Sequence, residues 1–170
     1  MSLPISPLTP LAETPPAESH HAVRRVAALN PHCVVCGHRN PHGLQLTFRI
    51  DGESVTADWI PGTNWESFRG VIHGGVISTV LDEAMSKAII AQGLEAFTMD
   101  LRVRFKQKLH TGEAVQVRGW VVEKQKRRIT AEARICSHSG GEHAHAWGTF
   151  LIPPRSPLST MQDAAATIVT

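Results

Sequence analysis

The chain has 170 residues, of which 42% are hydrophobic and 19% are charged, and its formal net charge is +2. This length is typical of a single domain, and this composition is typical of a globular protein with a sizeable core. The near-balance of charge argues against binding to nucleic acid or to a membrane surface. Residues 100–134 nevertheless carry ten Lys or Arg against four Asp or Glu, a surplus of six, which suits either a phosphate-bearing ligand or solvated strand faces.

The three cysteines form no disulfide framework, and an odd number is typical of a reducing compartment. No apolar run approaches the roughly 18 residues that a membrane-spanning helix needs. Residues 1–19 contain five prolines and lack the basic and apolar regions of a signal peptide. We therefore expect a cytoplasmic protein.

The composition divides the chain into a disordered N-terminal arm (1–20), one folded domain (21–152) and a C-terminal tail (153–170). Within the domain, residues 44–50 and 54–60 are predicted to form two strands around the Asp51-Gly52 turn. A helix is predicted over 75–92, ended by Gly93. Apolar and polar residues then alternate in four segments, which is typical of antiparallel strands with one covered face. These strands are predicted at 97–106, 115–122, 129–136 and 143–152.

Two strands, one long helix and four further strands predict an α+β fold, in which a curved antiparallel sheet of about six strands wraps around the central helix. Such a sheet has open edges, and open edges often pair with a second copy of the chain. We therefore expect a homodimer.

Polar residues lead directly into the helix at His73-Gly74-Gly75. The first N–H groups of a helix have no partner within it, and the helix dipole adds partial positive charge there. Because glycine has no side chain, a ligand can approach these groups closely. The arrangement could polarise a carbonyl oxygen or hold a developing oxyanion; a tight loop that needs flexible backbone is the alternative.

The helical periodicity separates two adjacent acids, Asp82 and Glu83. Glu83 precedes Lys87 by one turn, which predicts an exposed ion pair. Asp82 falls in a narrow groove between Ser78 and Ser86 on a mostly apolar helix. It is therefore either a functional carboxylate or a surface acid that stabilises the helix.

The spacing His73-Gly74-Gly75, six residues, Asp82 resembles the PaaI-like thioesterases of the hotdog-fold superfamily. The segments from Cys33 to Leu46 and from Leu101 to Glu113 are similar to members of that family too, so that the resemblance covers residues 30–152. It implies a hotdog fold, dimerised edge to edge and with further pairing into a homotetramer left open. It also implies hydrolysis of acyl-coenzyme A (acyl-CoA) at the dimer interface, with no cofactor or metal.

The resemblance also implies roles for individual residues. Asp82 would be the general base or the nucleophile, and the backbone of Gly74 and Gly75 would polarise the thioester carbonyl. His73 would position the substrate or the leaving thiolate. Thr98, on the strand after the helix, would orient the attacking water.

Further substrate contacts are candidates at both ends of the domain. Ser67 stands six residues before His73, where some members carry an Asn. Trp65 and Phe68 could line the acyl pocket. The basic turn at Lys126, Arg127 and Arg128 could bind the phosphates of coenzyme A, or it could be a solvated hairpin tip.

Strand alternation places Thr98 opposite Phe97 and Met99. If those two side chains pack on the covering helix, Thr98 points away from its own helix. It would then reach only a site that is shared with a second subunit.

Other signals are weaker. Cys33-x-x-Cys36 could bind zinc, but a structural site needs four ligands, and the available partners stand at no standard spacing, so no metal site is predicted. These partners are His32, His38, His42 and Cys136. His143 and His145 share one strand face and are expected at the surface. The alternative function is a non-catalytic acyl-CoA-binding or sensor protein on the same fold; an enoyl-CoA hydratase and a zinc-dependent interaction module are less favoured.

Overall fold

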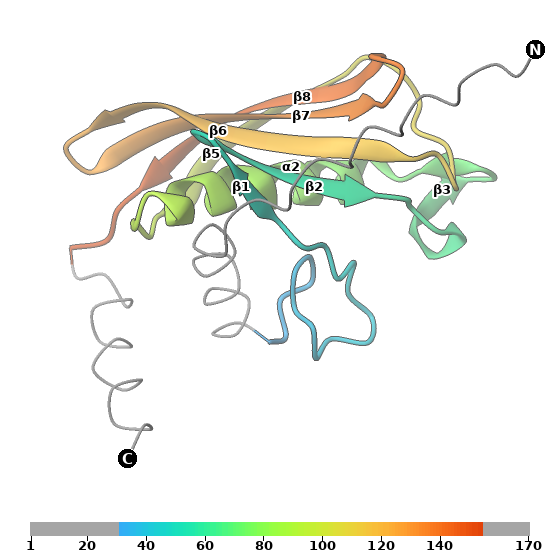
Figure 1. The fold of residues 1–170 in the computed structure, drawn as a ribbon, viewed down its shortest axis with the longest axis horizontal. Coiled ribbons are helices and arrows are strands. Elements are labelled where there is room, and N and C mark those ends of the chain that lie inside the picture. The colour runs from blue at the N-terminus through green and yellow to red at the C-terminus, as the bar shows by residue number, and fades with distance from the viewer. Residues whose placement is uncertain (1–30, 155–170) are drawn as a thin grey trace, which may run out of the picture.

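In a computed structural model the described residues are 31–154. Six strands form one antiparallel sheet in the order β1-β2-β6-β7-β8-β5 (Figure 1). The predicted arm at 1–20 and most of the predicted tail at 153–170 lie outside the described residues. The strands of this sheet are β1 (Arg49–Asp51), β2 (Ser54–Trp59), β5 (Phe97–Phe105), β6 (Val115–Gln125), β7 (Arg128–Ser137) and β8 (Glu142–Leu151).

One long helix, α2 (Gly74–Ala91), lies along one face of this sheet (Figure 1). Its apolar stripe, which includes Leu81 and Ala84, is fully buried against the strands. The helix lies so close to β6 that a Cβ atom on Gly119 would be 2.4 Å from the carbonyl oxygen of Ala84. The predicted α+β hotdog architecture is therefore confirmed, and so are its six strands.

The end of α2 is also as predicted. Gly93 has a φ of +72°, the left-handed conformation in which glycine is favoured. The N–H groups of Gly93 and Leu94 donate to the carbonyl groups of Ile90 and Ile89, at 2.8 and 3.3 Å. These bonds satisfy carbonyl groups that the helix itself leaves unpaired. The described helix is not long and apolar enough to cross a membrane.

The segment before α2 contains structure that the sequence pattern did not predict. A 3-10 turn, η1 (Thr63–Trp65), precedes a small hairpin of β3 (Glu66–Phe68) and β4 (Val71–Ile72). Two hydrogen bonds hold this hairpin: His73 N–H donates to Trp65 O at 2.8 Å, and Ile72 N–H donates to Leu109 O at 2.9 Å. The hairpin therefore fixes the direction in which the chain enters α2.

The first strand is shorter than predicted. Instead of joining β1, Leu44 and Leu46 donate their N–H groups to Val34 and Val35, both at 2.8 Å. Gln45 between them has a φ of +52°, which is not a strand conformation. Residues 31–46 consequently form a separate looped segment in front of β1.

Candidate active site

Asp82 and Thr98 are in direct contact. The Thr98 hydroxyl donates a hydrogen bond to Asp82 Oδ1 at 2.8 Å, and both residues belong to the same chain. The prediction that Thr98 reaches only a site shared with a second subunit is therefore wrong. The assumption behind that prediction, that Phe97 and Met99 pack on the helix, is also wrong, because these side chains are 58% and 51% exposed.

A bulge in the edge strand β5 explains this error. Thr98 pairs with Phe150 on β8, but the next pair is Asp100 with Thr149, so Met99 is an extra residue. Residues paired directly across a sheet point to the same face, and Phe150 is fully buried in the core. Thr98 therefore faces α2. An extra residue reverses the alternation on one side of it, and a strict period of two cannot reveal where that happens.

Asp82 is half-buried near the middle of α2. Burial raises the pKa of its carboxyl, the Thr98 hydrogen bond opposes that rise, and the neighbouring Glu83 adds to it. Ser78 does not contribute its hydroxyl to Asp82, because that hydroxyl donates to Gly74 O at 2.9 Å. The carboxylate is thus held by one oxygen and has a raised proton affinity.

His73 caps the beginning of α2. Its Nδ1 accepts a hydrogen bond from the Gly75 N–H at 2.8 Å, so a neutral ring carries its proton on Nε2. Within residues 31–154, by contrast, no group accepts a hydrogen bond from the Gly74 N–H. The sequence suggested two glycine N–H donors, and of these only the Gly74 N–H is therefore available to a ligand. The Nε2–H of His73 is a further available donor.

A pocket of about 330 Å³ opens at this helix start. Gly74 and Ile77 line one side of it, and Phe105, Lys106 and Lys108 line the other. A Cβ atom on Gly74 would lie 3.3 Å from the ring of Phe105. The absence of a side chain at Gly74 therefore keeps this corner accessible.

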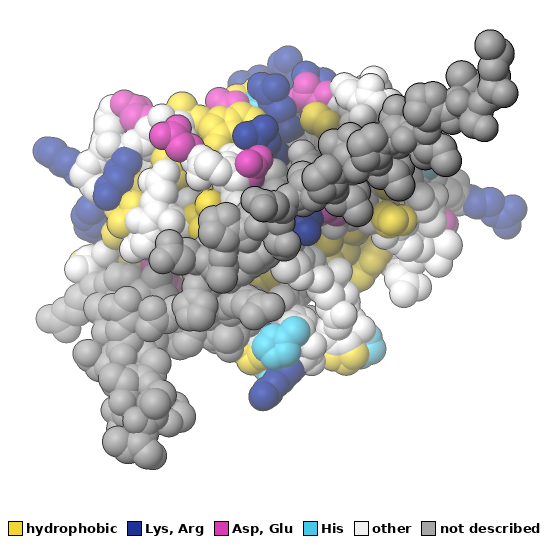
Figure 2. All heavy atoms as spheres, in the orientation of Figure 1, with side chains coloured by type: hydrophobic (Ala, Val, Ile, Leu, Met, Phe, Trp, Pro, Cys, Tyr) yellow, Lys and Arg dark blue, Asp and Glu magenta, His cyan; other side chains and the backbone are white. Residues whose placement is uncertain are grey.

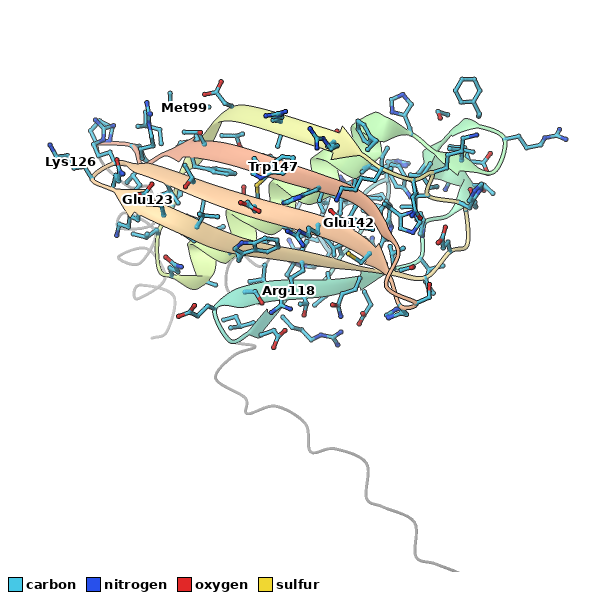
Figure 3. All side chains as sticks on the ribbon, turned by 90° about the horizontal axis from the view of Figure 1, so that it is seen from above. Met99, Arg118, Glu123, Lys126, Glu142 and Trp147 are labelled. Carbon is cyan, nitrogen blue, oxygen red and sulfur yellow. The ribbon has the colours of Figure 1, made fainter. Side chains whose placement is uncertain are left out.

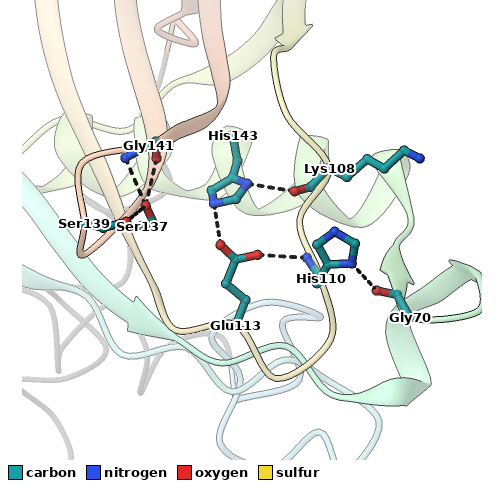
Figure 4. A network of polar contacts seen from close by, with 8 residues as sticks. All are labelled: Gly70, Lys108, His110, Glu113, Ser137, Ser139, Gly141 and His143. Atoms are coloured by element: carbon teal, nitrogen blue, oxygen red, sulfur yellow. Dashed lines mark hydrogen bonds and ion pairs between the residues drawn. The ribbon is translucent and has the colours of Figure 1, made fainter.

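A polar network that includes the buried His143 lies beside the pocket (Figure 4). His143 Nδ1 lies 3.0 Å from Lys108 O, and its Nε2 lies 3.0 Å from a carboxylate oxygen of Glu113. The second oxygen of Glu113 accepts from His110 N–H at 3.1 Å, and His110 Nδ1 lies 3.0 Å from Gly70 O. The network thus connects β8 to the β3–β4 turn through residues 108–113.

Both histidines of β8 are buried, which corrects the expectation of surface residues. His143 is 3% exposed, and His145, which is 6% exposed, lies 2.8 Å from Glu132 through its Nε2. Each polar ring has an acidic partner, and this pairing allows it to be buried. Neither the depth of these rings nor their partners could be read from strand alternation.

The remaining candidates are distributed unevenly. Trp65 is half-buried, and its carbonyl oxygen accepts a hydrogen bond from the His73 N–H, whereas Ser67 is exposed and Phe68 is 78% exposed.

The basic turn lies at the other end of the sheet, between β6 and β7. Figure 3 shows Lys126 at that tip, and Figure 2 shows basic side chains projecting there. Within one chain the basic turn is therefore remote from the helix start.

The cysteine pair contacts α2 beside Asp82, which sequence reasoning missed. Cys33 Sγ lies 3.8 Å from Glu83 Oε2. A hydrogen bond with Cys36 lowers the pKa of Cys33 to about 6. Glu83 does pair with Lys87 as predicted, but the lysine side chain is only 3% exposed. The expectation of an exposed ion pair is therefore wrong, because segment 31–46 covers this side of the helix.

Residues 69–144 match the family model of the thioesterase superfamily. A comparison with curated proteins finds no match. Among solved structures, the E. coli PaaI protein from the phenylacetic acid degradation operon has a TM-score of 0.69 and 17% identity, over 81% of this chain and 97% of that one. A thioesterase superfamily protein has a TM-score of 0.68 and 22% identity over 71% of this chain, which spans 60% of that protein's length.

A third structure is a hypothetical thioesterase from Streptococcus pneumoniae TIGR4 with coenzyme A. Its TM-score is 0.58 and its identity 16%, over 61% of this chain and 80% of that one. Two further structures of that protein are alanine variants, one of an aspartate and one of a threonine, and the two positions are sixteen residues apart. Asp82 and Thr98 have the same separation.

Proposed function

We propose that this chain, which belongs to the thioesterase superfamily and has the hotdog fold, hydrolyses acyl-CoA to a free acid and coenzyme A. The observation that carries this proposal is the hydrogen bond of 2.8 Å between Thr98 and Asp82. It orients a half-buried carboxylate on the central helix, as catalysis by a base or a nucleophile requires.

Asp82 activates the attack on the thioester. As a general base, its carboxylate takes a proton from water while the water oxygen bonds to the carbonyl carbon. Direct attack by the carboxylate, followed by hydrolysis of the resulting anhydride, is the nucleophilic variant of the same assignment. In both, the carbon–sulfur bond breaks and coenzyme A leaves as a thiolate. Thr98 holds Oδ1, so that Oδ2 is the oxygen free to react.

The Gly74 N–H stabilises the oxyanion that forms at the carbonyl oxygen. It has no acceptor within residues 31–154 and lies at the positive end of the α2 dipole. The Nε2–H of His73 is a second donor toward the substrate or the leaving sulfur. Trp65, Ser67 and Phe68 contact the acyl group, and Lys126, Arg127 and Arg128 contact the phosphates.

Two chains are needed to complete each site. Gly74 and Asp82 are eight residues apart on α2, which corresponds to about 12 Å along a helix. A carbonyl oxygen bound to the Gly74 N–H lies about 3 Å from that nitrogen, and Asp82 must lie about 3 Å from the carbonyl carbon or from the one water that attacks it; this separation along the helix therefore favours a site in which the two groups come from different chains. The Gly74 donor of one subunit therefore acts together with Asp82 and Thr98 of the other.

The edge strand β5 provides the surface for this dimer. Within residues 31–154 it pairs only with β8, and its other edge is open. Phe97, Met99 and Phe105 on this strand are 58%, 51% and 53% exposed. Open edges with apolar side chains favour pairing with a second copy. Further pairing of dimers into tetramers stays a prediction.

Asp82→Asn tests the catalytic assignment, because the amide keeps the shape but cannot accept a proton. Release of coenzyme A from a panel of acyl-CoA substrates should fall by about 10²–10⁴-fold, with little change in KM. Asp58→Asn, the same change at an exposed position on β2, far from β5 in the strand order, is the control and should retain the wild-type rate.

Two results would overturn the proposal. If Asp82→Asn hydrolyses acyl-CoA at the wild-type rate, Asp82 is not catalytic. If the wild-type protein binds acyl-CoA by calorimetry but releases no coenzyme A from any substrate of the panel, the protein is a non-catalytic acyl-CoA-binding protein.

A further inference from the structure

Three potential metal ligands converge where segment 31–46 meets α2. The sulfur atoms of Cys33 and Cys36 and a carboxylate oxygen of Glu83 all lie within 4.8 Å of one another. Cys36 is only 7% exposed. Fifty residues separate Cys33 from Glu83, so only the tertiary structure assembles this group.

The backbone around the cysteines holds both sulfurs in place. Gly37 N–H donates to Cys33 O at 3.0 Å, and Val35 N–H points at Cys33 Sγ at 3.4 Å. The turn is closed so tightly that a Cβ atom on Gly37 would lie 2.4 Å from Cys33 N. The pairing of residues 34–35 with 44–46 then anchors this turn on its other side. The two sulfurs are therefore preorganised before any ligand binds.

The charge around the cluster suits a divalent cation. Lys87, 3% exposed, places its Nζ 3.3 Å from Glu83 Oε1. A divalent cation bound by two thiolates and one carboxylate has a net charge of −1, which the Lys87 ammonium neutralises. Burying an uncompensated charge is costly. The Lys87 ammonium therefore lowers the free-energy cost of burying the ion-bound cluster.

We propose that Cys33, Cys36 and Glu83 bind a zinc ion through two thiolate sulfurs and one carboxylate oxygen. Zinc binds both sulfurs as thiolates, any proton that they still carry is released to the solvent, and water occupies the fourth position of the tetrahedron. Ligands about 2.3 Å (S) and 2.1 Å (O) from a tetrahedral zinc ion lie roughly 3.5 Å apart, close to the 3.8 Å between Cys33 Sγ and Glu83 Oε2. Thiolate ligands select zinc over magnesium or calcium.

With three protein ligands and one water, the site would have open coordination, unlike a closed structural site with four protein ligands. The ion would tie segment 31–46 to α2 at the residue next to Asp82. Its third ligand, Glu83, is fifty residues from Cys33 and is neither a histidine nor a cysteine at a standard spacing, so the sequence pattern did not indicate it. The inference does not depend on the proposed hydrolysis, because it rests on residues that take no part in that reaction.

Zinc content tests the site without any substrate. The full-length protein, loaded with zinc under reducing conditions and dialysed, should retain about one zinc per chain by mass spectrometric metal analysis. Cys33→Ser combined with Cys36→Ser should abolish retention, and Glu83→Gln should weaken it. Cys136→Ser, which removes the half-buried thiol on β7, is the matched control and should retain the metal.

A second measurement covers the case in which the double variant fails to fold. Wild-type protein loaded with Co²⁺ should show thiolate-to-cobalt charge-transfer absorption, and added zinc should displace it. The proposal is overturned if the wild-type protein shows no such absorption and retains no zinc. It is equally overturned if Cys136→Ser loses the metal as completely as the double variant, or if Cys33 and Cys36 form a disulfide under the reducing conditions used for loading.

Discussion

The Thr98 hydroxyl donates a hydrogen bond to the Asp82 carboxylate at 2.8 Å and so links the edge strand to the middle of the central helix. Asp82 is half-buried there, and the bond fixes one of its two oxygens. The bulge at Met99 makes this contact possible, because it turns Thr98 toward the helix. One irregularity in strand pairing thus determines the geometry of the candidate catalytic carboxylate.

Thr98→Val should lower the rate constant for release of coenzyme A about 10–100-fold. Valine keeps the branched shape but removes the donor, and a hydrogen bond to a charged group contributes about 1.5–3 kcal/mol. Thr98→Ser retains the hydroxyl and should stay within a few-fold of the wild-type rate. Steady-state kinetics with one acyl-CoA compare the two variants, and equal rates for them would exclude an orienting role for the hydroxyl.

Gly74→Pro should lower the hydrolysis rate about 10²–10³-fold, because it deletes one oxyanion donor. Proline is tolerated at the first position of a helix, and His73 already has the extended conformation that precedes proline, with ψ of 130°. Gly74→Ala is the matched control, since it adds a Cβ atom beside Phe105 but keeps the N–H. Its rate should fall much less than that of Gly74→Pro, because it narrows the pocket corner but leaves the oxyanion donor in place.

Phe97→Glu combined with Met99→Glu should convert the protein to a monomer and abolish hydrolysis. Charges at this edge would repel across the expected interface, and each site needs two chains. Val122→Glu, at another exposed apolar position on β6 that is 54% exposed, is the control. Light scattering measures the mass; a double variant that remains dimeric and active would place the interface elsewhere.

Mixed dimers of Gly74→Pro and Asp82→Asn chains should regain activity that neither variant has alone. One of the two sites in such a dimer receives both intact halves. No recovery on mixing and refolding would indicate that Gly74 and Asp82 act within the same subunit.

Lys126→Gln combined with Arg128→Gln should raise KM for acyl-CoA several-fold and leave kcat almost unchanged. These side chains extend from the tip of the β6–β7 turn, where loss of charge weakens binding of phosphate groups. Arg127 is left intact because its Nε donates to Ile152 O at 2.9 Å. A short acyl thioester without phosphates is the control substrate, and its KM should not respond; an equal rise for both substrates would contradict phosphate binding.

Gly119→Val should destabilise the fold by about 1–3 kcal/mol or more and lower the melting temperature by several degrees. A Cβ atom there would meet the Ala84 carbonyl oxygen at 2.4 Å, and the helix cannot move away without opening the core. Gly62→Ala, where nothing lies within 4 Å of the added atom, should melt like the wild type. Thermal unfolding followed by circular dichroism measures both.

The sequence by itself determined the elements and their type. Helix α2 follows from a run of apolar residues with a period of 3.6, and its end follows from a glycine at a position that requires a positive φ. The alternation in β6, β7 and β8 predicted the sheet in the same local way. The helical period also separated Asp82 from Glu83, and so identified the carboxylate that contacts Thr98.

Only the tertiary structure decided how these elements meet. The bulge at Met99, which reversed the predicted direction of Thr98, depends on the pairing of β5 with β8. The meeting of Glu83 with Cys33 joins residues fifty positions apart. Periodicity describes the faces of one element; register, bulges and contacts between distant residues depend on how the elements pack together, which no local pattern encodes.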